Sequence, residues 1–234
     1  MKLEGRDRYV NDIFTTVAPH IDLLSSLFSF GIADLWRRRL VKLAHFQKSD
    51  KVLDLCTGTG KLAILTAGKL GSGGSVTGID LCSGMLEKAR AKSRAAYLPV
   101  TFEQQNAKSL PYKNGYFDVV TVAFGMRNIM DTRPALLESH RVLRNNGRFI
   151  CLELTKPTSR WFRYVYDPYV NILIPLIGGI VTRDREPYSY LPRSIEAFPA
   201  PSEFVRSIEQ CGFANVSTYR MTLGIATIFL AIRS

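Results

Sequence analysis

The sequence predicts an α/β protein built on a doubly wound, mostly parallel β-sheet. First, short apolar and β-branched runs alternate with helix-like segments from Lys51 to Leu154, a pattern typical of βαβ units. Second, the strand-like runs are continuously apolar, which is expected when helices cover both faces of a sheet. Third, the first run passes directly into a glycine-rich turn and a helix, as at the ligand-binding edge of open α/β sheets.

The strands are predicted in chain order from these runs. Seven are expected, at 51–56, 75–80, 100–105, 117–124, 147–154, 215–220 and 227–232. Helices are expected to begin near Lys61 and near Ser83, and another to run through Leu136 and Leu143. A further helix is expected after Pro201 with Ser202 as its N-cap, so that the last two strands complete one edge of the sheet.

The chain is predicted to form a single domain, 1–234, with two helical additions. Its 234 residues, 46% hydrophobic and 22% charged, suit one globular domain with an appendage. We expect a cofactor-binding core over 51–154 and a C-terminal helix with two strands over 200–234. A helical pair over 10–46 is dense enough in apolar residues to be a lid or a wall, and 157–199 is expected to be an inserted substrate lid.

The charge balance points to an anionic partner. Thirty-one Lys and Arg against twenty Asp and Glu give a net charge of +11, which suits nucleic acid, a lipid headgroup surface or an acidic metabolite. The four cysteines have neither CxxC spacing nor nearby histidines, so we expect reduced thiols and no metal site. Glu4, Asp7 and Asp12 interrupt the N-terminus, so we expect no signal peptide and a cytoplasmic location.

The string VLDLCTGTG carries the strongest signal for a nucleotide ligand. A strand that ends in Asp54 runs into Gly58 and Gly60 and then a helix, and the glycines let an adenosyl group approach the backbone. Asp80 follows twenty residues after Gly60, at the end of the second strand, with Leu81 beside it. From there a carboxylate can accept hydrogen bonds from both ribose hydroxyls. We therefore predict an adenosyl site at this edge of the sheet.

The charges around this loop favour a cationic nucleoside over a dinucleotide. Ala63 completes a formal G-x-G-x-x-A, the pattern of dinucleotide-binding loops, but NAD would place two negative phosphates near Asp54. S-adenosylmethionine has no phosphate, and its sulfonium and ammonium groups suit Asp54 and loop carbonyls. Asn106 and Ala107, just after the third strand, are placed to read the adenine edge. The alternatives are a loop-capping role for Asp54 and an Asx turn at Asn106.

Several longer strings give the sequence a family resemblance. VLDLCTGTG, GIDLCSGML, NAKSLPY, FGMRNIMD and HRVLRNNGRFICLEL, with LFSFGIADLWRR and SYLPRSIEAFP, resemble the ubiquinone/menaquinone biosynthesis C-methyltransferase family over nearly the whole chain. The resemblance implies S-adenosylmethionine as the methyl donor and a class I Rossmann-like sheet of seven strands whose last strand is antiparallel. It also implies that Thr59, Asp80, Asn106 and Ala107 contact the donor.

Three positions depart from the family pattern. Relatives commonly carry a Tyr-Asp pair in the first lid helix, where this chain has Ile21 and Asp22. Ser25 stands where asparagine is usual, and Lys61 replaces the acidic residue that often follows GTG. A substrate-holding role for the lid tyrosine is therefore not expected in this protein.

The resemblance implies methylation of a ring carbon of a prenylated quinol, and we expect Arg127 and Asn128 to assist it. Both follow the fourth strand, at the end of the sheet predicted to hold the donor. A cation beside a ring hydroxyl favours the phenolate, which pushes charge onto the neighbouring carbon, and Asn128 can orient a hydroxyl or a water. The alternative role of Arg127 is a salt bridge to Asp131 or Glu153.

The segment from Tyr164 to Val181 is the most membrane-like part of the chain. Its uninterrupted apolar stretch, 172–181, is ten residues long, whereas a spanning helix needs about 20. We therefore expect the segment to lie on or within another structure and not to span a membrane. Four tyrosines can flank a substrate ring: Tyr166, Tyr169, Tyr188 and Tyr190. Five aliphatic residues can line a prenyl-tail path or simply fill core: Ile172, Leu173, Ile174, Leu176 and Ile177.

Basic residues accompany this segment. They are Arg160, Arg163, Arg183, Arg185 and Arg193. Each basic side chain near an anionic lipid surface contributes about 1 kcal/mol of binding. We therefore expect peripheral contact with an anionic membrane from the cytoplasmic side, and a homodimer is one open alternative for the assembly.

Other functions compete with this prediction. An RNA methyltransferase would suit the net charge, but AFGM at 123–126 replaces the N/D-P-P-Y/F string of amino-directed enzymes, so we expect no nucleic-acid partner. The intact glycine loop disfavours a noncatalytic scaffold for quinone synthesis, and Asp54 disfavours an NAD-dependent oxidoreductase. Within the family, demethylmenaquinol is the expected substrate and a polyprenyl benzoquinol of ubiquinone synthesis is the alternative, because the sequence carries no separate signal for either ring.

Overall fold

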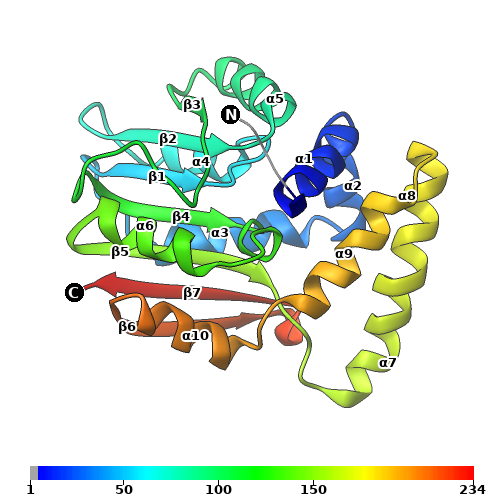
Figure 1. Ribbon diagram of the computed structural model, residues 1–234. Helices are drawn as coiled ribbons and strands as arrows, with labels where there is room; N and C mark the ends of the chain where they lie inside the picture. Colours follow the sequence, from blue (N-terminus) through cyan, green and yellow to red (C-terminus); the bar gives the residue numbers. More distant parts are fainter. Residues whose placement is uncertain (1–4) are drawn as a thin grey trace.

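A computed structural model describes residues 5–234 and contains a seven-stranded sheet (Figure 1). The strand order is β3-β2-β1-β4-β5-β7-β6. The strands are β1 (Lys51–Leu55), β2 (Ser75–Asp80), β3 (Thr101–Gln104), β4 (Phe117–Ala123), β5 (Leu143–Leu154), β6 (Phe213–Met221) and β7 (Ala226–Arg233). The pairs among β1 to β5 are parallel, whereas β7 runs antiparallel to both β5 and β6. The predicted fold class is therefore confirmed.

Helices cover both faces of this sheet, because alternate residues of each strand point to opposite faces. Along β5, Phe149 and Cys151 belong to one buried cluster, whereas Ile150 and Leu152 belong to another. The first cluster is closed by α6 (Arg133–Val142) and α10 (Pro201–Gln210), and the second by α3 (Ile32–Leu43), α4 (Lys61–Ala67) and α5 (Ser83–Ala95).

Two further groups of helices stand beyond the carboxyl ends of the parallel strands (Figure 1). The N-terminal helices are α1 (Gly5–Val17) and α2 (Ile21–Phe28), together with α3, which itself lies on a face of the sheet. The insertion helices are α7 (Arg160–Pro168), α8 (Ile174–Thr182) and α9 (Glu186–Ala197). Helix α9 packs against both α1 and α8, so the two groups meet over the edge of the sheet.

The N-terminal segment differs from its prediction. The sequence predicted a helical pair over 10–46, but the structure forms three helices that begin at Gly5. Pro19 follows α1, and proline has no N–H with which to continue a helix. Gly31 separates α2 from α3 at φ 74°, a left-handed conformation that glycine adopts without strain.

The predicted N-cap of α10 is wrong. Pro201 occupies the first helical turn, where its missing N–H has no intrahelical partner to lose, and Ala200 takes the N-cap position. Glu203 accepts a hydrogen bond from the Ala200 backbone N–H at 3.1 Å, so this end of the helix is satisfied without Ser202.

Helices α7 and α8 join into one continuous helix through a π-helical turn, η2 (Tyr169–Leu173). The turn follows Pro168, which lacks the N–H for a regular α-helical bond. Among the described residues this helix, Arg160–Thr182, has 23 residues and by length and composition could cross a membrane. The apolar stretch predicted from the sequence, 172–181, is shorter, because Asp167 and Asn171 interrupt the apolar run although they do not interrupt the helix.

Candidate active site

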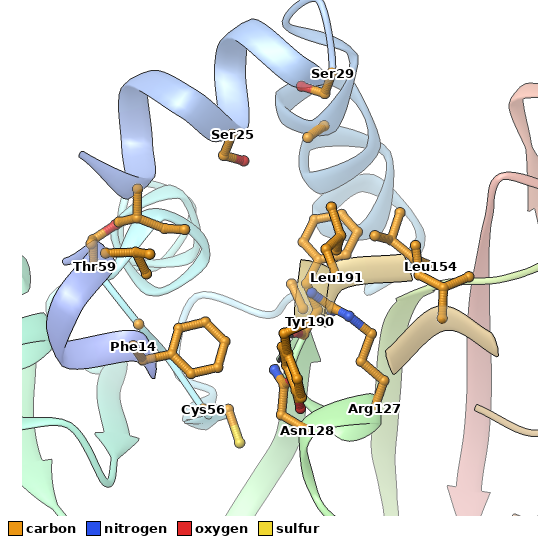
Figure 2. Close-up of a pocket in the computed structure, with 18 of the residues that line it drawn as sticks. Phe14, Ser25, Ser29, Cys56, Thr59, Arg127, Asn128, Leu154, Tyr190 and Leu191 are labelled. Carbon is orange, nitrogen blue, oxygen red and sulfur yellow. Dashed lines mark hydrogen bonds between the residues drawn. The ribbon is translucent and has the colours of Figure 1, made fainter. Parts of the chain in front are cut away.

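A cavity of about 710 Å³ lies between the carboxyl ends of β1, β2 and β4, the N-terminal helices and the insertion helices (Figure 2). Small-molecule sites usually have volumes of about 300–1,000 Å³. Most residues predicted to bind a methyl donor line it: Asp54, Gly58, Thr59, Asp80, Leu81, Asn106 and Ala107. Gly60 is not among the lining residues, so its contribution to the site is through the shape of the loop.

The glycine loop takes a conformation that needs both glycines. Gly58 has φ 55° and Gly60 has φ 77°, in the left-handed region. A Cβ on Gly60 would approach the Ala89 Cβ and the Phe102 ring at 3.0 Å, so the loop packs tightly on its inner side. A Cβ on Gly58 would meet nothing within 4 Å, so the backbone there is open to a ligand.

Asp80 is held at the end of β2 by two backbone donors. The N–H of Gly58 donates to Oδ2 at 2.8 Å and the N–H of Cys82 donates to Oδ1 at 2.9 Å. Burial raises the pKa of Asp80, and these backbone hydrogen bonds oppose that rise. Each carboxylate oxygen can still accept another hydrogen bond, which is what a pair of ribose hydroxyls requires.

Asp54 lies behind the loop and is 1% exposed. It accepts hydrogen bonds from Thr57 Oγ1 at 2.6 Å and Thr121 Oγ1 at 2.7 Å, so the loop-capping role considered from the sequence is formed. Burial raises the pKa of Asp54 to about 6. Above that pH its negative charge suits a cationic ligand and opposes a pyrophosphate, so the site fits S-adenosylmethionine better than NAD.

Asn106 and Ala107 follow β3, as predicted, and contribute to the cavity wall. Asn106 Oδ1 accepts a hydrogen bond from the Lys108 backbone N–H at 2.9 Å, which is the Asx turn considered as the alternative. The turn occupies one lone pair of the amide oxygen and leaves the amide nitrogen without a partner among residues 5–234. This nitrogen can therefore still donate a hydrogen bond to the edge of an adenine ring.

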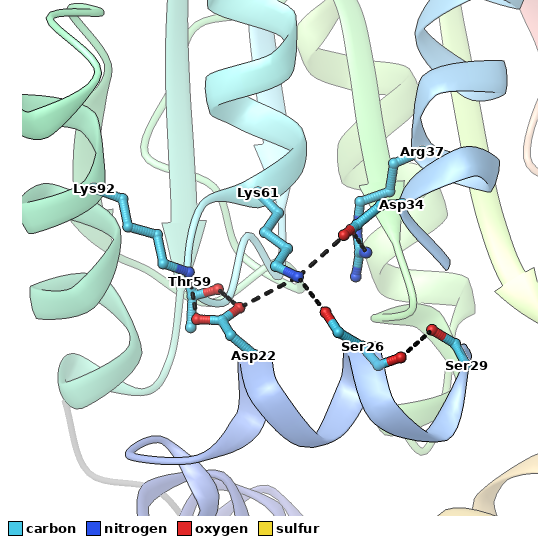
Figure 3. Close-up of polar contacts among 8 residues, drawn as sticks. All are labelled: Asp22, Ser26, Ser29, Asp34, Arg37, Thr59, Lys61 and Lys92. Carbon is cyan, nitrogen blue, oxygen red and sulfur yellow. Dashed lines mark hydrogen bonds and ion pairs between the residues drawn. The ribbon is translucent and has the colours of Figure 1, made fainter. Parts of the chain in front are cut away.

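Polar contacts tie the N-terminal helices to the glycine loop (Figure 3). Thr59 Oγ1 donates to Asp22 Oδ1 at 2.8 Å, and Lys92 from α5 forms an ion pair with the same carboxylate. Lys61 Nζ lies 3.8 Å from Asp22 and 3.5 Å from Asp34. Lys61, one of the positions that depart from the family pattern, thus joins an ion-pair network around Asp22, the residue next to Ile21.

Arg127 forms the salt bridge that the sequence offered as its alternative role. Its Nη1 lies 2.7 Å from Glu153 Oε1, and the Glu153 side chain is fully buried. Arg127 also donates to the Phe124 carbonyl at 2.6 Å and to Ser194 Oγ at 3.3 Å. Asp131 instead accepts from the Arg133 backbone N–H. Arg127 still lines the cavity, so the ion pair holds the guanidinium at the wall.

Asn128 is fixed between two partners. Its Nδ2 donates to the Phe124 carbonyl at 3.2 Å, and the Tyr190 hydroxyl donates to its Oδ1 at 3.1 Å. Figure 2 shows Arg127, Asn128 and Tyr190 gathered on one side of the cavity, with Thr59 and Phe14 on the other. The ring-binding groups expected from the sequence therefore face the glycine loop across the cavity.

The insertion helices supply the apolar part of the cavity. All four tyrosines proposed to flank a ring line it: Tyr166, Tyr169, Tyr188 and Tyr190. Of the five aliphatic residues proposed for a tail path, Leu173 and Ile174 line it. Ile172 and Leu176 are exposed, at 65% and 43%, and Ile177 is half-buried outside the lining. The long helix therefore contributes one face to the cavity.

Sequence reasoning missed one contact within the cavity wall and one side chain that lines the cavity. Tyr190 could be proposed only as an aromatic neighbour, because its bond to Asn128 joins residues 62 positions apart. Arg37 stands in a run with Arg38 and Arg39 and was not singled out from the sequence, but its side chain is only 11% exposed and it lines the cavity. The helical spacing of the apolar residues in 33–41, which places Arg37 but not Arg38 or Arg39 on the apolar face of α3, was a signal that could have separated them.

The sheet order, the glycine loop and the strand-end carboxylates define a class I S-adenosylmethionine-dependent methyltransferase. The fold recurs in a methyltransferase of this kind from Aquifex aeolicus, with a TM-score of 0.62 and 18% identity over 85% of this chain and 89% of that one. It recurs as well in one from Thermotoga maritima, with a TM-score of 0.67 and 16% identity over 95% and 99% of the two chains.

The chain belongs to the ubiE/COQ5 methyltransferase family, whose model matches residues 2–233. A demethylmenaquinone methyltransferase from Thermus thermophilus is 41% identical over 221 residues, which cover 94% of this chain and 100% of that protein. The ubiquinone/menaquinone biosynthesis C-methyltransferase UbiE from Geotalea uraniireducens is 35% identical over 98% of both chains. The protein is therefore an S-adenosylmethionine-dependent C-methyltransferase of menaquinone/ubiquinone biosynthesis, and the family resemblance is confirmed.

Proposed function

We propose that the protein methylates a ring carbon of demethylmenaquinol to give menaquinol. The Thermus relative, which this chain matches over its whole length, is named for that quinone. A polyprenyl benzoquinol of ubiquinone synthesis is the second candidate, because the name of the Geotalea relative covers both quinones.

The observation that carries a prenylated acceptor, which both candidates share, is the apolar part of the cavity, here called the apolar arm. It begins beside Asn128 and Tyr190 and is walled by both groups of helices, with Phe14, Val17, Leu24, Phe28, Val170 and Ile174 among its lining. It reaches the surface at Phe30, 76% exposed, and Leu173, 42% exposed. A polar ring at the inner end and a prenyl tail along the apolar arm would match this change of polarity.

The polar end of the arm suits a quinol ring oxygen. S-adenosylmethionine supplies an activated methyl group, so the protein has to align the ring carbon and favour the phenolate. Asn128 keeps its second Nδ2 hydrogen available, because Tyr190 and the Phe124 carbonyl fix the rest of the amide. Arg127 Nη2 makes no hydrogen bond to any residue of 5–234, so Glu153 holds the guanidinium and leaves this donor free. Two such donors at one ring oxygen stabilise its anion.

Competition between two acceptors tests the proposal. The purified protein would receive equal amounts of demethylmenaquinol and a polyprenyl benzoquinol with the same tail, kept reduced, and methyl-labelled S-adenosylmethionine. Mass spectrometry should find the label mainly in menaquinol. Label mainly in the benzoquinol would contradict the naphthoquinol assignment, and label in neither would contradict the proposed acceptor class.

We further propose that the protein works in the cytoplasm as a peripheral membrane protein. Exposed apolar side chains surround the outer end of the apolar arm: Leu23, Leu27 and Phe30 near α2, and Ile172, Leu176 and Ile180 along η2 and α8. Phe30 stacks on Tyr169 with 6.0 Å between ring centroids, so the two groups are continuous. The exposed Arg160, Arg163, Arg183 and Arg185 flank the long helix and suit anionic headgroups.

Vesicle sedimentation tests the membrane proposal. Binding to vesicles rich in phosphatidylglycerol should exceed binding to phosphatidylcholine vesicles and should weaken as salt rises, because exposed charges are screened. Ile180→Ser should reduce binding, whereas Leu137→Ser, which alters an exposed leucine of α6, should not. Equal binding to both vesicle types at every salt concentration would contradict the proposal.

A further inference from the structure

Four cationic side chains line the cavity, and the charge of one of them, Arg37, is incompletely paired. Lys108 forms an ion pair with Asp7, Arg127 pairs with Glu153, and Lys61 lies near two carboxylates. Arg37, on α3, pairs with Asp34, a carboxylate that it shares with Lys61. Its guanidinium carbon stands 5.0 Å from the centroid of the Phe124 ring, and Asp22 and Asp54 are close enough to act on its charge. It therefore faces the part of the cavity between the ends of β1 and β4.

Arg37 has more donors than acceptors. Within residues 5–234 the guanidinium makes one hydrogen bond, from Nη1 to Asp34 Oδ1 at 2.7 Å, out of its five N–H groups. Asp34 is itself shared with Lys61 at 3.5 Å and is 43% exposed. Burial lowers the pKa of Arg37, because its charge has been taken out of water, although Asp34 opposes the shift. A guanidinium that remains charged in such a place favours a further anionic partner.

The methyl donor also carries an anion, and none of the residues predicted from the sequence to bind the donor is a cation. Its sulfonium and ammonium groups suit Asp54 and the loop carbonyls, whereas the methionine carboxylate needs a cation in the same region. A guanidinium presents parallel N–H groups that match a carboxylate in a bidentate arrangement. We propose that Arg37 binds the methionine carboxylate of S-adenosylmethionine. This inference goes beyond the proposed function, which concerns the methyl acceptor.

Calorimetry without any quinol tests the proposal. The two ligands are S-adenosylmethionine and its decarboxylated analogue, and the two proteins are the wild type and Arg37→Gln. The analogue has one more net positive charge, so affinities are compared within each protein. The preference of a protein is its affinity for S-adenosylmethionine divided by its affinity for the analogue. The informative quantity is the preference of the wild type divided by the preference of the variant. This ratio should be about 10 to 100, as expected for charge-assisted hydrogen bonds. Affinity for the analogue should be unchanged by the substitution.

Matched variants keep the test decisive. Arg39→Gln changes an exposed arginine of the same helix and should leave the preference intact. Arg37→Lys keeps the charge but loses the fork, so it should retain only part of the preference. A ratio near one, or an equal loss of affinity for both ligands in Arg37→Gln, would overturn the proposal.

If Arg37→Gln does not fold, the Arg37→Lys protein decides. An unchanged preference in Arg37→Lys would then count against bidentate binding, and a reduced one would support it. None of these outcomes depends on which quinol is methylated, because the experiment contains no acceptor.

Discussion

The two walls of the cavity are built in opposite ways. The strand-end wall consists of polar groups fixed by their near neighbours, such as Asp80 by the Gly58 and Cys82 amides and Asp54 by Thr57. The helical wall consists of apolar side chains and of a few polar ones that contact residues far away in the chain, such as Tyr190, which donates to Asn128 after β4. Donor binding therefore depends on local strand and turn geometry, whereas acceptor binding depends on how two groups of helices pack.

The walls also differ in how firmly they are held. The strand ends belong to a continuous sheet, whereas partly exposed ion pairs such as Asp22–Lys92 and Asp7–Lys108 join the N-terminal helices to the core. Exposed or partly exposed ion pairs each contribute only about 0–1 kcal/mol. We therefore expect substitutions in the strand-end wall to change donor affinity and substitutions in the helical wall to change turnover.

Arg127→Ala should have the largest effect. Removing the donor expected at the ring oxygen should lower kcat by about 100- to 1,000-fold, while S-adenosylmethionine affinity stays near that of the wild type. It also leaves Glu153 buried without its cation, which should cost about 3–5 kcal/mol of stability, so kcat and thermal unfolding are measured together. Arg127→Lys separates the effect on kcat from the effect on stability, because lysine can keep the ion pair with Glu153. Unchanged kcat in Arg127→Ala would contradict the role assigned to Arg127 at the ring oxygen.

Asp80→Asn tests the strand-end wall. It replaces a charged acceptor of ribose hydroxyls, so we expect S-adenosylmethionine to bind about 10- to 100-fold more weakly. Asp131→Asn, an exposed residue beyond the loop, serves as the control. Equal affinities in wild type and Asp80→Asn would show that this wall does not hold the donor.

Tyr190→Phe tests the helical wall with a small change. The ring and its edge contact with Tyr9 are kept, but Asn128 Oδ1 loses its hydrogen bond. We expect kcat to fall by about tenfold, as for one buried hydrogen bond, with donor affinity unchanged. A fall in donor affinity without a change in kcat would remove the distinction between the two walls.

The smallest expected effect is on the pH dependence of donor binding. Asp54 has a pKa of about 6 in the folded protein, so it loses its charge below that pH and attracts a cationic donor less. Affinity should be about fourfold lower at pH 5.5 than on the plateau above pH 7. Calorimetry on Asp54→Asn should show a flatter profile, and an identical pH step in that variant would contradict the assignment.

Stability should change with pH in the opposite direction. The folded pKa of Asp54 is raised above its ordinary value of 3.8, so its contribution to stability is present below that value and is lost as the pH rises through about 6. The Tm difference between wild type and Asp54→Asn, measured from pH 4 to 7, checks this sign.

The difference between the two walls also explains which features could be predicted from the sequence. Asp54, the GTG turn and Asp80 were predictable because strand and turn patterns are local and place the ends of parallel strands at one edge. The role of Arg127 was not settled, because its choice of Glu153 depends on how β4 and β5 align. Arg37 and the Tyr190–Asn128 bond were missed, since both depend on the packing of helices against strand ends far away in the sequence.

The most direct test of the account is to locate the transferred methyl group. Wild-type protein, [methyl-¹³C]-S-adenosylmethionine and demethylmenaquinol would be combined in detergent, and the product examined by NMR, with Asp80→Asn as the low-affinity control. The account predicts a single labelled methyl bonded to a quinone ring carbon, formed much more slowly by the control at limiting donor. A label on a ring oxygen, or no transfer by the wild type, would contradict it.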